Sequence, residues 1–378
     1  MSNNFNLSDE EFALLVLACT DGVGPIVSKA LIAHFGSAQQ VVNASYRDLT
    51  NAPYLSDKLA KLLTSEEPRQ LANRELQILQ AHPDIQLITQ ANANYPQHLQ
   101  QTPDSPLVLF VRGELPTNAP MISIVGTRHM TSYTPSFLKR FLSDLANVCP
   151  NAIIISGLAY GTDITAHQLA LEYGLRTVGI VAHGLHTLYP SVHAPIVTEM
   201  IASGGGIATE YTFNTKPIPA RFVARNRIVA GLSSATIITE SQQKGGALIT
   251  AQLARDYNRE VFALPGRVLD AESAGCLQLI ESQKARPLTS LKYFLNTMGI
   301  GTKEETASMT PLFGADDAPV SDPLQAAILQ HLQQQGPTTL DNLVSALGAD
   351  VSSILVALMQ LESMDRLSNG AGGMIRLK

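Results

Sequence analysis

The middle of the chain alternates short apolar runs with longer stretches of helical spacing, and this alternation restricts the fold more than any other feature of the sequence. Between residues 121 and 264, six short runs rich in Ile, Val, Ala and Thr are separated by stretches of ten or more residues. Continuous apolar strands that alternate with helices are typical of βαβ units, whose parallel sheet is covered on both faces. The sequence therefore predicts an α/β domain with a doubly wound parallel sheet.

The elements expected in this domain follow the alternation directly. Strands are predicted at Met121–Val125, Ala152–Ile155, Thr177–Val181, Gly206–Thr209, Ala235–Thr239 and Val261–Leu264. Helices are predicted at about Tyr133–Ala146, Asp163–Tyr173, Ala194–Ala202, Ala220–Ala230 and Ala247–Asn258. In such a sheet the ligand binds at the carboxyl ends of the strands, so the loops that follow the strands are the candidates for function.

Two smaller modules flank this core, which we expect over residues 111–298. The preceding residues, 1–110, have helical apolar spacing interrupted by the turn Gly22-Val23-Gly24-Pro25. This pattern resembles a SAM or helix-hairpin-helix domain, in which the N–H groups of a glycine turn can hold a phosphate. A plain helix–helix turn is the favoured alternative, because the charge around it is acidic.

After a predicted linker at residues 299–321, the last segment, 322–378, has the pattern of a winged helix. Helices are predicted at Asp322–Gln335, Leu340–Leu347 and Val351–Met364, and a strand at Met374–Leu377. Three helices followed by a hairpin suit that fold. The third helix has no Lys or Arg at residues 351–360, so a protein contact or plain packing fits it better than base recognition.

The charge is distributed unevenly along the chain, and the net value of −6 hides this. A negative chain is a poor partner for nucleic acid, because phosphate binding needs clustered Lys and Arg. However, residues 121–290 carry 14 basic and 11 acidic side chains, whereas residues 1–120 carry 7 and 12. Any polyanionic partner should therefore bind the central domain.

Two loops early in the core combine glycines with groups that suit an anion. In Gly126-Thr127-Arg128 the glycine allows a sharp turn and the guanidinium suits a phosphate, although a salt bridge from Arg128 to a carboxylate is the alternative. The loop Ser156–Asp163 offers backbone N–H groups at the start of a helix, where an anion is favoured. Asp163 itself is expected to cap that helix.

Two further candidates follow. The stretch Arg221–Ser233 places cations, an amide and a ring one helical turn apart, which suits a nucleic-acid single strand, although a solvated basic face would have the same pattern. Lys244-Gly245-Gly246 is another glycine turn ahead of a helix. The candidate DNA-binding residues from the four loops are Gly126, Thr127, Arg128, Ser156, Gly157, Leu158, Ala159, Gly161, Arg221, Phe222, Arg225, Asn226, Arg227, Lys244, Gly245 and Gly246.

Enzyme chemistry has little support in the sequence. Glu210 and Glu240 each end a strand and could act as a base, but such carboxylates more often cap or pair. The chain has no GxGxxG or GxxxxGK[ST] motif, and the spacing of His183, His186 and His193 fits no metal site. We therefore expect a protein that is not an enzyme and that needs no cofactor and no metal.

The cysteines and the N-terminus favour the cytoplasm. Cys19, Cys149 and Cys276 are far apart and odd in number, which argues against a disulfide framework. No targeting segment and no membrane-spanning segment is visible in the sequence.

A series of short motifs runs through the chain in a fixed order. They are Tyr95-Pro96, Pro106–Gly113, Ile124–Arg128, Ser156–Ala159, Gly161–Asp163 with His167, Gly184-Leu185, Tyr189-Pro190, Glu210-Tyr211, Arg225–Ser233, Gly246–Ala251, Arg259–Gly266 and Gly275-Cys276. Each is weak alone, but their number and order are specific. With these motifs the chain resembles the DNA-processing protein A family, also called Smf, over nearly its whole length.

The resemblance implies a function. Members of this family have a Rossmann-like core that binds single-stranded DNA and loads the recombinase RecA onto it during natural transformation, displacing single-strand-binding protein. The resemblance also implies a homodimer formed through the core. Carried over to this chain, the DNA-phosphate pocket falls on Gly126, Thr127, Arg128, Ser156, Gly157, the Arg225-Asn226-Arg227 stretch and the Lys244-Gly245-Gly246 turn.

The chain departs from the family pattern at a few positions. Family members often have a basic residue in place of Tyr160, Ile in place of Thr162, Asn in place of His193, and Ser-Gly-Ser in place of Gly245-Gly246-Ala247. The first change would weaken a phosphate contact or exchange it for base stacking. Two rival functions stay open: a nucleotide-binding or nucleotide-hydrolysing enzyme on the same core, and a sequence-specific regulator that binds duplex DNA through residues 321–378.

Overall fold

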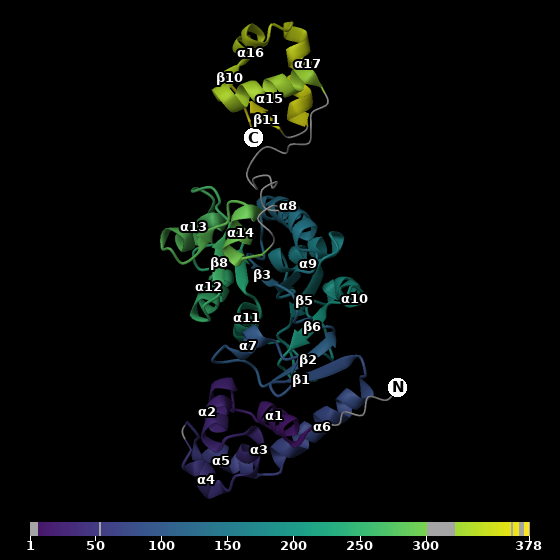
Figure 1. The fold of residues 1–378 in the computed structure, drawn as a ribbon, viewed down its shortest axis with the longest axis vertical. Helices are drawn as coiled ribbons and strands as arrows, with labels where there is room; N and C mark the ends of the chain where they lie inside the picture. The colour runs from purple at the N-terminus through teal and green to yellow at the C-terminus, as the bar shows by residue number, and fades with distance from the viewer. Residues whose placement is uncertain (1–6, 53, 301–321, 364–365, 370–373, 378) are drawn as a thin grey trace. The chain divides into compact units, whose positions relative to one another are not determined.

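The computed structural model describes residues 7–52, 54–300, 322–363, 366–369 and 374–377 (Figure 1). The chain divides into two compact units, residues 1–309 and 310–378. Most of the predicted linker at 299–321, and the predicted end of the last helix at Met364, lie outside the described residues. Among the described residues, no single helix is long and apolar enough to cross a membrane, and only the pair Leu340–Leu347 and Val351–Glu362, bent by 116°, passes that test jointly.

A nine-stranded sheet forms the centre of the first unit. Its strands are β1 (Ile85–Thr89), β2 (Val108–Gly113), β3 (Met121–Val125), β4 (Ile153–Ser156), β5 (Arg176–Ile180), β6 (Gly206–Thr209), β7 (Ala235–Ile238), β8 (Glu260–Ala263) and β9 (Arg286–Pro287), in the order β1-β2-β6-β5-β4-β3-β7-β8-β9. The run from β6 to β9 is parallel. The doubly wound parallel sheet and all six predicted strands are therefore confirmed.

Three strands of the sheet were not predicted. β2 pairs with β6 in antiparallel orientation, and β1 pairs antiparallel with β2, so one edge of the sheet departs from the parallel arrangement. β9 has only two residues, too few to produce a pattern. The predicted boundary between residues 110 and 111 lies inside β2, and the domain limits stay predictions.

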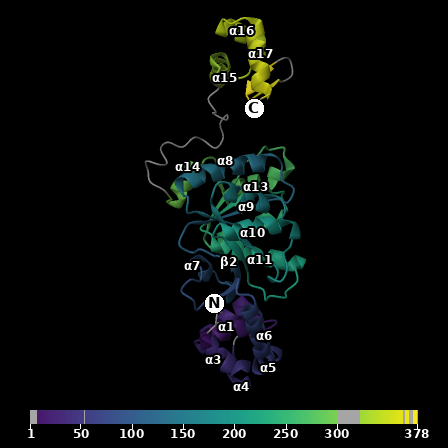
Figure 2. The ribbon, with the colours of Figure 1, turned by 90° about the vertical axis from the view of Figure 1, so that its right-hand side faces the viewer.

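Helices cover both faces of the sheet, as expected of a doubly wound fold. On one face α9 (Thr162–Glu172) packs between α8 (Tyr133–Val148) and α10 (Ala194–Ala202), and on the other α11 (Pro219–Leu232) packs against α12 (Gly246–Asp256) (Figures 1 and 2). α13 (Ala274–Glu281) and α14 (Leu291–Met298) complete the core. The centre of the sheet lies in the core, because β3, β4, β6 and β7 are buried at every position.

The N-terminal residues form a helical module that shares a hydrophobic core with the sheet. Its helices are α1 (Asp9–Cys19), α2 (Pro25–Phe35), α3 (Ala38–Asn43), α4 (Tyr46–Thr50), α5 (Asp57–Thr64) and α6 (Glu67–Ala81), and α7 (Gln97–Gln100) follows β1. Ser8 and Glu11 form a capping box that starts α1. The glycine turn before α2 faces the core, because Gly24 lines a small cavity of about 160 Å³ together with Pro106 and Leu107.

The second unit is a winged helix, as predicted. It contains α15 (Pro323–Gln335), β10 (Thr338–Thr339), α16 (Leu340–Leu347), α17 (Val351–Ser363), β11 (Leu367–Asn369) and β12 (Met374–Leu377). Its small sheet has the order β10-β12-β11 and is antiparallel. The three helices close over an apolar core that includes Ile328, Leu343, Ile354 and Ile375.

Candidate nucleic-acid interface

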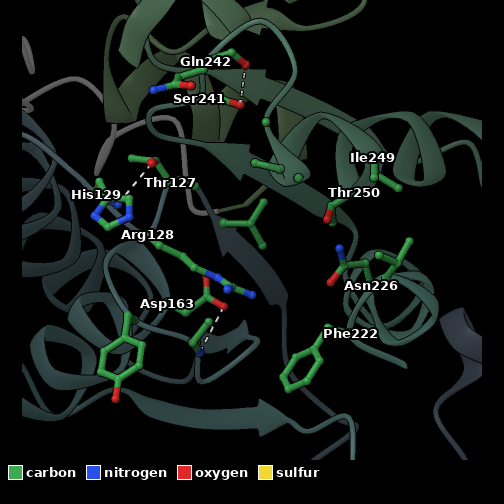
Figure 3. A pocket seen from close by; sticks show the side chains of 18 of the residues that line it. Thr127, Arg128, His129, Asp163, Phe222, Asn226, Ser241, Gln242, Ile249 and Thr250 are labelled. Atoms are coloured by element: carbon green, nitrogen blue, oxygen red, sulfur yellow. Dashed lines mark hydrogen bonds between the residues drawn. The ribbon is translucent and has the colours of Figure 1, made fainter. Parts of the chain in front are cut away.

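A pocket of about 370 Å³ opens at the carboxyl ends of β3 and β7 (Figure 3). These neighbouring strands form the switch point of the sheet, since the chain continues from β3 toward one edge and from β7 toward the other. The pocket is therefore where a doubly wound fold places a ligand. It is lined by Val125, Gly126, Thr127, Arg128, His129, Ala159, Tyr160, Asp163, Phe222, Val223, Arg225, Asn226, Ser241, Gln242, Gly245, Gly246, Ala247, Ile249 and Thr250.

The loop after β3 supplies the exposed cation of the pocket. The N–H of Thr127 donates to the carbonyl of Glu240 over 2.8 Å, which ties the loop to the end of β7. The Thr127 hydroxyl accepts from the N–H of His129 over 3.1 Å, so the turn is closed locally (Figure 3). Arg128 is exposed and its side chain extends into the pocket, where its guanidinium is open to a ligand (Figure 3).

Two glycines let the loops after β3 and β4 approach each other closely. Gly161 has φ +75°, and a Cβ atom there would lie 2.5 Å from the carbonyl oxygen of Thr127 and 2.6 Å from that of Arg128. A Cβ at Gly126 would overlap the hydroxyls of Thr162 and Thr239. Only glycine fits both places, so these residues shape the pocket and do not supply side chains to it.

The first residues of the loop after β4 build the loop and do not reach the pocket. Ser156 is buried, and its hydroxyl donates to the carbonyl of Ile124 over 2.6 Å. Leu158 is buried with φ 58°, and its carbonyl lies 2.9 Å from Nδ1 of His193. Of the candidates from this loop, Ala159 lines the pocket, whereas Ser156, Gly157, Leu158 and Gly161 lie behind it.

Arg225 is buried beneath this loop. Its guanidinium donates to the carbonyl of Gly157 over 2.6 Å and also to the carbonyl of Ile180, and only 4% of the residue is exposed. Asp163, whose carboxylate accepts from the N–H of Ala159 over 3.3 Å, supplies the compensating charge. Burial raises the pKa of Asp163, and the nearby Arg225 opposes that rise. Arg225 therefore borders the pocket as part of its floor.

The other residues of α11 point in different directions. Phe222 and Asn226 line the pocket one turn apart (Figure 3). Arg227 faces the opposite way, where it pairs with Glu210 and donates to the carbonyl of Asp104 over 2.6 Å. Arg221 lies outside the pocket with its guanidinium 5.3 Å from the centre of the Tyr211 ring. The three arginines of this stretch thus lie in three different environments.

The start of α12 forms the wall opposite Arg128. Gly245 and Gly246 line the pocket, and exposed Lys244 immediately precedes them. Among the described residues no side chain caps this helix, and its first turn contains no acidic residue. Unpaired N–H groups and the helix dipole make such a terminus favourable for an anion. The start of α9, by contrast, already carries Asp163.

Several residues that line the pocket are absent from the predicted DNA-binding set, although Tyr160 was noted at a position where family members often carry a basic residue. Tyr160 stands 51% exposed with its ring 5.1 Å from that of His193, in an edge-to-face arrangement. His129, Ser241 and Gln242 also contribute. Their positions next to the glycine loops were the available signal, but their residue types alone do not indicate phosphate binding.

Both carboxylates considered as catalytic bases have structural partners. Glu240 accepts from the N–H and the hydroxyl of Thr131 over 3.0 and 2.7 Å, and from the hydroxyl of Thr134 over 2.6 Å. Glu210 pairs with Arg227, and neither carboxylate lines the pocket. Within the described ranges, no group of three or more His, Cys, Asp or Glu side chains could hold a metal ion.

Comparison with known families decides the relationship. The family described as "DNA recombination-mediator protein A" matches residues 86–299, more than half of the chain, and the "DprA winged helix domain" matches residues 315–373. The chain belongs to the DprA family. The family resemblance noted in the sequence is therefore confirmed, and the pocket lies in the part of the chain that matches the recombination-mediator family.

Relatives named Smf or DprA cover most of the chain. "Protein Smf" of Synechocystis sp. is 30% identical over 97% of this chain and 98% of its own length. "DNA processing protein DprA" of Streptococcus pneumoniae is 30% identical over 67% of this chain and 90% of its own length. The DprA family relationship thus extends over nearly the full sequence.

Solved DprA structures share the fold. The X-ray structure of DprA from Streptococcus pneumoniae covers 80% of this chain and 99% of its own, with a TM-score of 0.56 and 25% identity. DprA from Helicobacter pylori covers 56% of this chain and 95% of its own, with a TM-score of 0.50 and 32% identity. The Helicobacter pylori structure concerns the single-stranded DNA binding mode of that protein.

Proposed function

We propose that this protein binds single-stranded DNA in the pocket at the ends of β3 and β7. The observation that carries the proposal is the joint presence of Arg128, the open start of α12 and the Phe222 ring in one 370 Å³ cavity. A guanidinium and helix N–H groups suit a phosphate, and an aromatic ring suits an unpaired base. The DNA-binding mode of the Helicobacter pylori relative supports the same assignment.

The pocket suits a single strand better than a duplex. Stacking on Phe222 requires a base that has left the double helix, whereas a duplex offers only its backbone and groove edges. Apart from Arg128 and neighbouring Lys244, the charges are internal or outside the pocket, so the cavity lacks the broad basic surface that duplex binding needs. Binding should be tolerant of sequence, because every base has a face that can stack.

The wider function we propose is that of a recombination mediator. The protein would form a homodimer through its core, displace single-strand-binding protein and load RecA onto incoming single strands in natural transformation. Membership of the recombination-mediator family supports this part of the proposal. It is tested by whether the protein speeds RecA filament formation on strands already coated with single-strand-binding protein.

Fluorescence anisotropy tests DNA binding directly. A labelled oligo-dT and a duplex of the same length are titrated with protein at two salt concentrations. We expect tighter binding of the single strand, weakened by salt through the release of counterions. Arg128→Ala should lower the affinity and reduce the slope of log K against log salt by about 0.7, the value for one phosphate contact on a single strand.

The matched control is Arg47→Ala, which removes the same charge from an exposed position on α4. It should leave the affinity unchanged. Equal affinity for single strand and duplex, or equal effects of the two substitutions, would contradict the proposal.

A further inference from the structure

An exposed aromatic ring continues the pocket wall beyond its lining residues. Tyr189 packs edge to face against Phe222, with 5.7 Å between the ring centres, and it is 51% exposed. Phe222 lines the pocket, whereas Tyr189 lies just outside it. Tyr189 belongs to the loop that follows β5, so it extends the interface along the carboxyl edge of the sheet, away from β7.

The backbone at Tyr189 is held by a buried histidine. Its N–H donates to Nε2 of His183 over 3.1 Å, and Nδ1 of His183 lies 2.9 Å from the carbonyl of Gly184. Because Nε2 accepts a hydrogen bond, the proton of the neutral ring is on Nδ1 and is donated to Gly184. His183 is fully buried, so the fold anchors this loop firmly while half of the Tyr189 ring stays in solvent.

Two cations lie at or just before the start of α11, close to Phe222 in the chain. Arg221, beside Phe222 at the start of α11, lies over the Tyr211 ring and donates to the carbonyl of Lys216 over 2.5 Å. Lys216 itself is exposed. A guanidinium has five N–H donors, so Arg221 keeps donors for a further anion. The surface next to the pocket therefore presents two rings in contact with each other and two cations nearby.

We propose that a single strand leaving the pocket continues over this surface, with one base stacked on Tyr189 and a phosphate beside Arg221. This inference rests on the proposed function of the pocket and adds a second stacking position to it. A nucleic-acid strand is the occupant that fits, because exposed rings suit its bases and nearby cations suit its phosphates. It also accounts for Arg221, which lies outside the cavity.

The absence of tryptophan from the chain permits a specific test. Tyr189→Trp introduces one Trp reporter, and Tyr54→Trp places the same reporter at a 79% exposed site in the turn between α4 and α5. Unlabelled oligo-dT of about 16 nucleotides is added, within the range of single-strand site sizes. We expect Trp emission to be quenched in Tyr189→Trp and unchanged in Tyr54→Trp, while anisotropy of a labelled strand shows binding to both.

Affinity measurements separate this inference from the function of the pocket. Tyr189→Ala should weaken binding of the 16-nucleotide strand about ten-fold, as expected for the loss of one stacked base, while Tyr189→Phe should bind like the parent protein. A strand made abasic throughout should bind the parent and Tyr189→Ala equally.

Two outcomes would overturn the inference in distinguishable ways. If Tyr189→Trp binds the strand normally but its Trp emission is not quenched, the second stacking position is removed and the pocket stays intact. Equal strand affinity of Tyr189→Ala and the parent protein would have the same meaning. Failure of the parent protein to bind any single strand, or binding that Arg128→Ala leaves unchanged, would overturn the pocket and the inference together.

Discussion

The guanidinium of Arg225 donates to the backbone carbonyl of Gly157 over 2.6 Å, joining α11 to the loop after β4. The same side chain also bonds the carbonyl of Ile180 and lies near the carboxylate of Asp163. These contacts satisfy a buried charge with partners from within the protein. Arg225 and Arg128 therefore differ in kind, since only Arg128 is exposed to a ligand.

The two arginines should separate stability from binding. Arg225→Ala leaves Asp163 without its buried counter-charge, so we expect a loss of about 3–5 kcal/mol in the free energy of unfolding. Arg128→Ala should change stability by no more than about 0.5 kcal/mol and weaken single-strand binding. Urea unfolding and anisotropy measure both variants. Lost binding by Arg225→Ala with unchanged stability would show that Arg225 contacts DNA directly.

The close approach at Gly161 predicts a strong difference between two glycines. Gly161→Ala would place a side chain at φ +75° against the carbonyls of Thr127 and Arg128, and should cost at least about 1–3 kcal/mol of stability. Gly246→Ala is the control, because a Cβ there meets nothing within 4 Å and lies at the start of a helix. We expect the melting temperature to be lowered only for Gly161→Ala. Similar melting temperatures for both variants would contradict the strained geometry.

Two Arg–Glu pairs should contribute very differently to the free energy of unfolding. Arg227 and Glu210 have side chains only 12% and 14% exposed, whereas those of Arg286 and Glu260 are 50% and 41% exposed. Removing one member of a buried pair costs about 3–5 kcal/mol, but a surface pair contributes about 0–1 kcal/mol. Arg227→Ala should therefore destabilise the protein much more than Arg286→Ala in urea unfolding. Single-strand affinity of the folded Arg227→Ala protein should be unchanged, because Arg227 does not line the pocket.

The lowered pKa of His167 predicts that the protein loses stability in acid. Burial, with smaller contributions from His193 and Arg225, lowers the pKa of His167 to about 3. Between about pH 6.5 and pH 3 the unfolded chain binds a proton there that the folded protein does not, so this group's contribution to stability falls as the pH falls. The slope is about 1.4 kcal/mol per pH unit.

Substitution of His167 tests whether its pKa is lowered in the folded protein. In His167→Gln the contribution disappears, so the difference in unfolding free energy between pH 7 and pH 5 should shrink by about 2 kcal/mol. Urea unfolding at the two pH values gives the comparison. Identical pH dependence of the variant and the parent would show that the pKa of His167 is the same in the folded and unfolded states, which would contradict the lowered value.

The strands of the core could be predicted from the sequence because their signal is local. Each strand from β3 to β8 is a short apolar run. A run of this kind between helical stretches is compatible with few structures other than a buried strand. The predicted ends of these strands differ from the observed ends by at most one residue. β1 and β2 escaped prediction, since the register between Ile85–Thr89 and Val108–Gly113 depends on pairing across a long connection.

The loops of the pocket were also predictable, whereas the role of each residue in them was not. Glycines and cations after β3 and before α12 indicate an anion site whatever the exact packing. The direction of a helical side chain depends on what surrounds the helix. Arg221 and Arg225 lie one helical turn apart on α11, yet Arg225 is buried whereas Arg221 lies over the Tyr211 ring, and only the packing around the helix sets this difference.

The sequence by itself determined the doubly wound core, the winged helix, the family and most of the loops that line the pocket. Only the tertiary structure decided which cations are free to contact a ligand. Arg225 bonds the carbonyl of Gly157, 68 residues away, and Arg227 bonds that of Asp104, 123 residues away. A buried charge must find such partners, and these are brought together only when distant segments fold against each other. Arg128, by contrast, stays exposed at the pocket.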